Sequence, residues 1–156
     1  MKNKILLSCI IGLLAACSPF SSSHYGSLPS TQTQTWQWKM DAEHLRHVNQ
    51  IRTEANRLAV QVGHGEITKV QAAQLLNQFR ISTVGHNTID DSVYETYLKS
   101  AVNSQAGFIT TEQSKQQIKD ALQTWHTAWR TMGNNRPTDP AFTNFLMVVM
   151  GMPMLR

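Results

Sequence analysis

The placement of proline is the feature of this sequence that most constrains its fold. The chain has five prolines, and none of them falls between Trp36 and Asn135. Because proline breaks the interior of a helix, this long proline-free stretch permits uninterrupted helices. No Asn-Gly or Asp-Gly pair separates alternating apolar runs there, so β-hairpins are not indicated. The stretch is therefore predicted to be helical.

Apolar residues in this stretch recur at spacings of three and four, as they do along one face of a helix. Asp41 and Glu43 open the first predicted helix, where its dipole favours negative charge. Thr88 is expected to cap a third helix, with Asp91 at the third position. The predicted helices span residues 41–62 and 69–80, a segment that begins at Thr88, and residues 111–132 and 140–150. The side chains expected to face inward are Leu45, Val48, Ile51, Ala55, Leu58, Val62, Ala72, Leu75, Leu76, Phe79, Tyr94, Tyr97, Leu98, Ala101, Val102, Ile118, Leu122, Trp125, Trp129 and Met132.

Two turns between these helices share a pattern. Residues 65–72 and 107–114 both read Gly-x-Ile-Thr-x-x-Gln followed by a small residue. Glycine permits the turn, threonine caps the next helix, and glutamine three residues later completes a capping box. The pattern predicts two helical hairpins. It fits both a duplicated unit and two independent uses of a common turn.

The last predicted helix is apolar nearly all round. Its apolar residues, with the methionine that follows, are Phe142, Phe145, Leu146, Met147, Val148, Val149, Met150 and Met152. Such a helix either lies at the centre of a bundle or presents an apolar face to a partner. We therefore expect residues 36–156 to form an all-α domain, a small bundle of four to five helices. It consists of two hairpins and this C-terminal helix.

The start of the chain has the composition of a signal peptide. Lys2 and Lys4 precede an apolar run from Ile5 to Ala16. A helix of that length reaches roughly 18 Å at about 1.5 Å per residue, whereas a bilayer core is about 30 Å thick. The run is too short to span a membrane permanently, so residues 1–16 are interpreted as a signal peptide.

The residues Leu14-Ala15-Ala16-Cys17 that close this run resemble the lipobox of bacterial lipoproteins. The resemblance implies that Cys17 carries a diacylglycerol, and that its new amine is acylated with a fatty acid such as palmitate. Ser18, where aspartate would retain a lipoprotein in the inner membrane, implies the outer membrane, at its periplasmic face or at the cell surface. The alternative is an ordinary secretory leader, but no Ala-x-Ala site precedes Cys17.

Residues 17–35 separate this cysteine from the helical domain. They are dominated by Ser, Thr and Gln. A segment of this composition buries too little apolar area to offset the entropy of ordering. It is expected to be a flexible tether between the lipid anchor and the domain.

Charge and cysteine content exclude several classes of function. The net charge is +4, but removing Lys2 and Lys4 leaves 12 basic against 10 acidic residues. We therefore predict no nucleic-acid partner. The resemblance implies that Cys9 leaves with the leader and that Cys17 is acylated, so the mature domain is expected to have no disulfide and no thiolate metal site. No cofactor is expected.

The sequence carries no strong catalytic motif. Neither a Gly-x-Ser-x-Gly nucleophile nor a glycine-rich phosphate loop occurs. Asp90 and Asp91 are interpreted as the start of a helix rather than as catalytic carboxylates. His44 and His47 lie one helical turn apart and could share a metal ion, but no third ligand is evident. Both are therefore expected to be solvated residues on a helix face, and we predict neither a catalytic residue nor a metal site.

Aromatic and methionine side chains are better candidates for binding. The tryptophans either pack in the core or form an exposed shelf for a peptide or glycan. The candidate binding surface comprises Trp36, Trp38, Trp125, Trp129, Phe145, Met147 and Met150. Methionine-rich surfaces adapt to varied partners.

These features together predict a non-enzymatic envelope lipoprotein, anchored through Cys17, that binds a protein or another envelope component. One alternative is a module that binds a small ligand or a peptidoglycan fragment through tryptophans. Another is an enzyme with a histidine–carboxylate site. A protein-binding module should show an apolar patch or groove, a ligand binder a tryptophan-lined pocket, and an enzyme a pocket that holds histidines and carboxylates.

Overall fold

The computed structural model describes the backbone of residues 32–156 and the side chains of residues 42–156. This part of the chain is all-helical, as predicted, and contains no strand. The predicted signal peptide, Cys17 and most of the predicted tether lie outside the described residues. The helices are α1 (Gln32–Gly63), α2 (Lys69–Val84), α3 (Thr88–Gln105), α4 (Thr111–Trp129) and α5 (Ala141–Val149), with a short 3-10 turn, η2 (Gly133–Asn135), before α5.

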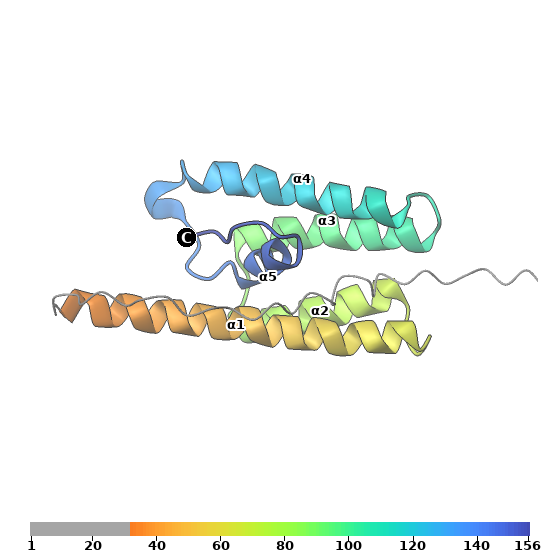
Figure 1. Cartoon of the computed structure of the whole chain (residues 1–156), viewed down its shortest axis with the longest axis horizontal. Helices are drawn as coiled ribbons and strands as arrows, with labels where there is room; N and C mark the ends of the chain where they lie inside the picture. The colour runs from red at the N-terminus through yellow and green to blue at the C-terminus, as the bar shows by residue number, and fades with distance from the viewer. Residues whose placement is uncertain (1–31) are drawn as a thin grey trace, which may run out of the picture.

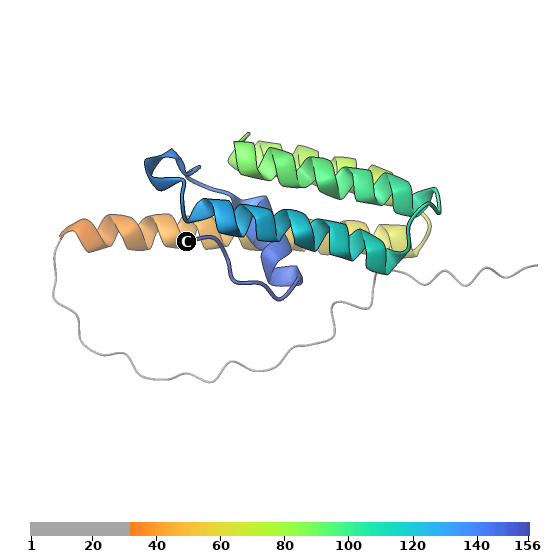
Figure 2. The same ribbon diagram turned by 90° about the horizontal axis from the view of Figure 1, so that it is seen from above.

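The long helices form two hairpins that lie as two layers, with α5 between them (Figure 1). Helices α1 and α2 make one layer, and α3 and α4 make the other. The short α5 runs across the long helices and contacts α1, α3 and α4 (Figure 2). The turns of both hairpins lie at the same end of the molecule, and the first turns of α1 project beyond the other helices at the opposite end.

The two hairpin turns have the same hydrogen-bond pattern, and both predicted capping boxes are confirmed. Gly65 and Gly107 adopt φ of +74° and +78°, which only glycine reaches without strain. Thr68 accepts from the backbone of Gln71, whose side chain accepts from the Thr68 N–H in return. The equivalent bonds join Thr110 and Gln113. The shared sequence pattern therefore encodes one turn used twice.

The core lies where α5 meets the two layers. Its largest apolar members include Ile51, Leu58, Ile89, Leu122, Phe142, Phe145, Leu146 and Met147. The ring of Phe142 meets Tyr94 and Tyr97 edge-on, with centroids 6.2 and 5.8 Å apart. Helix α5 is thus a central core helix, and not a free apolar face.

Some predicted inward positions are wrong. Each long helix packs against at least two other helices, and both contacts together determine which of its side chains are buried. Leu45, Leu75 and Val102 are 44%, 39% and 43% exposed. In α2 the buried positions are Leu76, as predicted, together with Ala73 and Arg80, which were not predicted to face inward. In α3 they are Ile89, Asp90, Val93 and Ser100, so two polar side chains occupy the face that packs on α4 and α5.

Helix ends also differ from the predicted ones. Helix α1 begins at Gln32, so it includes the last residues of the segment expected to be a tether. Asn87, and not Thr88, caps α3, because its side chain accepts from the N–H of Asp90. Helix α4 ends at Trp129 rather than Met132, and η2 follows. Among residues 32–156, none of the helices combines the length and the apolar character that crossing a membrane requires.

Candidate functional site

Three ionisable side chains from distant parts of the chain meet beside α1. The Nδ1 atoms of His44 and His47 lie 2.5 Å from the two carboxylate oxygens of Asp139, in the loop before α5. The three side chains are only 20%, 14% and 22% exposed. The expectation that the two histidines are merely solvated is therefore wrong. Their shared face of α1 was visible in the sequence, but the carboxylate that joins them was not.

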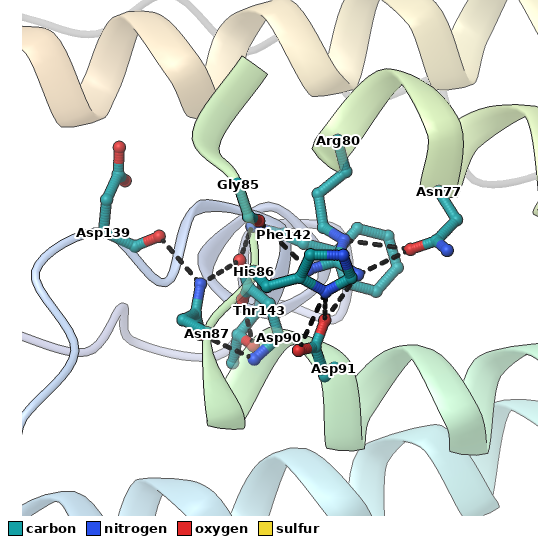
Figure 3. Close-up of polar contacts among 10 residues, drawn as sticks. All are labelled: Asn77, Arg80, Gly85, His86, Asn87, Asp90, Asp91, Asp139, Phe142 and Thr143. Atoms are coloured by element: carbon teal, nitrogen blue, oxygen red, sulfur yellow. Dashed lines mark hydrogen bonds and ion pairs between the residues drawn. The ribbon is translucent and has the colours of Figure 1, made fainter. Parts of the chain in front are cut away.

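The carboxylate of Asp139 is held in its ionised form. Burial by itself raises the pKa of Asp139, but the hydrogen bonds from His44 and His47 outweigh burial and hold that pKa below its usual value. The backbone oxygen of Asp139 also accepts a hydrogen bond of 3.2 Å from Asn87 (Figure 3). One loop residue therefore connects α1 to the start of α3.

The protonation state of His44 follows from the amide that faces its other nitrogen. The side-chain oxygen of Asn144 accepts from the Leu155 N–H at 2.7 Å, and its nitrogen donates to the Leu155 carbonyl at 3.2 Å. These two bonds fix which end of the amide is nitrogen. The same nitrogen lies 2.7 Å from His44 Nε2. An amide nitrogen only donates, so Nε2 must accept and the ring proton lies on Nδ1, which donates to Asp139.

This tautomer bears on metal binding. A histidine binds a metal ion through a nitrogen that carries no proton. The only such nitrogen of His44 faces Asn144, and Nδ1 already donates to Asp139. Among residues with described side chains, no group of three or more histidines, cysteines and carboxylates is arranged to hold a metal ion. The arrangement of His44, His47 and Asp139 is a hydrogen-bonded link between elements.

A second buried carboxylate lies at the start of α5. Asp90, on α3, is fully buried and accepts from the backbone N–H groups of Phe142 and Thr143, from the Thr143 hydroxyl and from Asn87 (Figure 3). Burial raises the pKa of Asp90, although these four hydrogen bonds act in the opposite direction. Asp90 thus lies in the first turn of α3, as predicted, and in addition its carboxylate caps the start of α5.

A buried arginine joins α2 to the same region. The guanidinium of Arg80, on a side chain 1% exposed, donates to Asn77 and lies 2.7 Å from an oxygen of Asp91. His86 lies 3.2 Å from both Asp91 oxygens, so one carboxylate binds both an arginine and a histidine (Figure 3). Burial alone raises the pKa of Asp91, but Arg80 and His86 bring it below its usual value. The cluster ties α2, the loop at His86 and α3 together.

An open groove of about 690 Å³ lies on the other side of α1, alongside α2. It is lined by Ala42, Leu45, Arg46, Asn49, Gln50, Thr53, Glu54 and Phe79. Leu45 and the partly buried Phe79 supply apolar surface, and uncharged amide and hydroxyl groups supply much of the rest. The groove contains neither a tryptophan nor a histidine, so it is separate from the histidine–aspartate cluster.

The members of the predicted binding surface whose side chains are described pack in or against the core. Trp129, Phe145 and Met147 are buried, with 9%, 6% and 0% exposed. Trp125 and Met150 are partly buried against the same core. The indole N–H of Trp125 donates to Ser92, and that of Trp129 donates to the backbone oxygen of Arg156. Trp36 and Trp38 lie on α1, but their side chains, like Cys17, lie outside the described residues.

Asp139 and Asn144 are the functional candidates that sequence reasoning missed. Asp139 falls between two predicted helices and Asn144 within the predicted apolar helix, and neither position carries a motif. The one available signal was a polar Asn144 among the apolar residues of α5, since a buried amide requires partners. Within the described side chains, every buried polar side-chain atom has such a partner.

Comparison of the chain with protein-family models, with curated proteins and with solved structures finds no match. The residues of the chain are therefore the basis for any functional proposal.

Proposed function

We propose that the protein is a lipid-anchored protein of the bacterial envelope, and that its helical domain binds a helix of another envelope protein in the groove beside α1. The leader that ends at Cys17 supports the location, through its resemblance to lipoproteins. The observation that carries the binding proposal is the open groove between α1 and α2 with its exposed Leu45.

The chemistry of the groove suits an amphipathic helix. Its apolar part, formed by Leu45 and Phe79, can receive apolar side chains spaced at three and four residues. The flanking Asn49, Gln50 and Thr53 offer donors and acceptors without charge. Arg46 and Glu54 each pair with a neighbour on α1, Glu43 and Arg57, so the groove presents no strong net charge.

The shape of α1 also supports a helical partner. Seven of the eight described residues that line the groove lie on α1, and the first turns of α1 project beyond the other helices (Figure 1). A partner helix that lies in the groove can continue along this projection. A longer contact of this kind increases the buried area without any rearrangement of the bundle.

The two alternative functions have less support. A tryptophan-based ligand site needs accessible indoles, but Trp129 is buried and Trp125 is partly buried. A histidine–carboxylate enzyme needs a ring nitrogen that can reach a substrate. In His44 both ring nitrogens are hydrogen-bonded within the protein, and the Nε2 atom of His47 lies 3.4 Å from Arg46.

Site-specific crosslinking in intact cells tests the groove. A photoreactive residue at position 50, in the groove, should give a defined product with a second polypeptide. The same residue at position 52, which is exposed outside the groove, should not. Leu45→Asp should abolish the product by placing a charge on the apolar floor. Val60→Asp is the matched control, because Val60 is 55% exposed on the same helix and lies outside the groove.

The outcomes separate the candidates. Equal products from positions 50 and 52, or a product that survives Leu45→Asp, would contradict binding in the groove. A product that contains glycan and no second polypeptide would support the small-ligand alternative.

The anchor is tested separately. Cells that express Cys17→Ala should incorporate no clickable fatty acid into the protein, whereas the parent chain should be labelled. Persistent label on the variant would refute lipidation at Cys17.

A further inference from the structure

The contact between His44 and Asn144 couples the charge of a histidine to the position of the end of the described chain. Asn144 uses its whole amide group: the oxygen binds the Leu155 N–H, and the nitrogen serves both the Leu155 carbonyl and His44 Nε2. From this geometry we propose that residues 152–156 form an acid-operated latch, which closes while His44 Nε2 is unprotonated and opens when that nitrogen binds a proton.

The conflict that opens the latch is one between donors. A proton from solvent that binds to Nε2 places an N–H group against the amide nitrogen of Asn144, 2.7 Å away, and neither can accept. The amide can turn its oxygen toward the charged ring. Its nitrogen then faces the Leu155 N–H, and its oxygen no longer accepts from that group. Asn144 can therefore serve the charged His44 or the Leu155 backbone, but not both.

The ionisable group that the His44 ring contacts directly is the carboxylate of Asp139. Asp139 is in direct contact with His44 and His47, and its carboxylate stays ionised as the pH falls into the histidine range, because its pKa is lowered. A ring that carries a second proton on Nε2 therefore still faces this carboxylate at its Nδ1 atom. Histidine is also the side chain that ordinarily gains a proton between about pH 8 and pH 5.

The other charged groups near Asn144 do not contact it in the way that His44 does. Helix α5 has no ionisable residue between Ala141 and Val149. On α1, the exposed Arg46 lies beside His47 and is paired with Glu43. On α3, Asp90 reaches Asp139 through Asn87 and binds the start of α5 at Phe142 and Thr143, without a direct contact to His44. Arg156, an exposed residue, has the one charged side chain among residues 152–156.

Opening the latch changes the surface of the bundle. Leu155 is 5% exposed and belongs to the core cluster, and the Arg156 carbonyl accepts from the Trp129 indole at 2.7 Å. Release of the segment uncovers the apolar site of Leu155 and frees the Trp129 N–H. The latch is thus a route by which acid exposes apolar surface near α4 and α5 while the two hairpins stay paired.

Nuclear magnetic resonance of the full chain, isotope-labelled and held in detergent, tests the latch between about pH 7.5 and pH 5. The His44 ring, the Leu155 amide and the Trp129 indole should shift with one common midpoint. Hydrogen exchange at the Leu155 amide, corrected for its intrinsic pH dependence, should become at least about tenfold faster at the acid end, because the amide loses its acceptor. Amides within α2 should keep their protection.

Three histidine variants sharpen the test. His44→Gln retains an acceptor for Asn144 but cannot titrate, so its Leu155 amide should stay protected at both pH values. His47→Gln and His64→Gln should retain the acid response, since neither ring touches Asn144.

The latch is overturned if the Leu155 amide of the parent chain keeps its protection from hydrogen exchange at the acid end of the pH range. It is also overturned if the Leu155 amide of His44→Gln loses protection there as the parent does. If His44→Gln does not fold, the parent chain alone decides. Separate midpoints for the His44 ring and the Leu155 amide then refute the coupling.

Discussion

Each hairpin turn carries its cap within its own eight residues, whereas α5 takes its cap from another helix. At the start of α2 and of α4, a threonine and a glutamine three residues apart exchange hydrogen bonds. At the start of α5, Pro140 offers no side-chain cap, and the Phe142 and Thr143 N–H groups are bound by Asp90 of α3. The hairpins are therefore specified locally, and the placement of α5 depends on the rest of the fold.

The difference explains why the polar groups gather around α5. An apolar helix between two layers gains its stability from burial, but burial alone does not fix its orientation. Asp90, Asp139 and Asn144 each bind a defined backbone or ring partner from another element. We infer that these bonds select one orientation of α5 out of several that would bury similar area.

The largest expected effect tests whether α5 is core. Phe145→Ala should lower the free energy of unfolding by about 3–5 kcal/mol, because it leaves a cavity in a packed interior. A urea melt of the chain measures it. Val148→Ala is the matched control on the same helix, since Val148 is 44% exposed, and it should change the midpoint little. Equal midpoints for the two variants would contradict the buried position of Phe145.

The remote cap should be the next largest contribution. Asp90→Ala removes the acceptor of four hydrogen bonds and leaves buried donors without partners, which should cost about 3 kcal/mol. Asp120→Ala, at an exposed carboxylate on α4, should cost less than about 0.5 kcal/mol. If the two variants melt alike, the start of α5 does not depend on Asp90, and the contrast with the hairpin turns is lost.

The contrast between local and remote caps also explains which features could be predicted from the sequence. The Gly-x-Ile-Thr-x-x-Gln pattern predicted both hairpin turns and their capping boxes, because all the atoms involved lie close together in the sequence. The burial of Phe145 was one of two open alternatives. Asp139 and Asn144 could not be placed, since each binds a residue that is close only after folding: His44 lies 95 positions from Asp139 and 100 from Asn144. Likewise, nothing local showed that Leu45 would be exposed.

The two aspartates that hold α5 should respond to pH with opposite signs. The pKa of Asp139 is lowered on folding, so its contribution to stability is present above the ordinary aspartate pKa of about 3.9 and is lost as the pH falls through the lower, folded value. The pKa of Asp90 is raised, so its contribution is fully present below about 3.9 and is lost as the pH rises through the folded value.

Urea melts at a series of pH values measure this. The destabilisation caused by Asp139→Asn should shrink toward acid pH, and that caused by Asp90→Asn should grow. Parallel pH profiles for the two variants would show that the two carboxylates are not held in opposite ways.

The smallest expected effects test whether the two hairpin turns are equivalent. Thr68→Ala and Thr110→Ala each remove one N-cap, and each should lower the free energy of unfolding by about 1 kcal/mol. Both side chains are exposed and make the same pair of bonds, so the two losses should match. Because neither threonine bonds to the other turn, the double variant should lose about 2 kcal/mol, the sum of the single losses. Urea midpoints of the parent, both single variants and the double variant provide the cycle. A loss at only one threonine would show that the shared pattern stabilises only one turn, and a non-additive double variant would show that the two turns are coupled through the bundle.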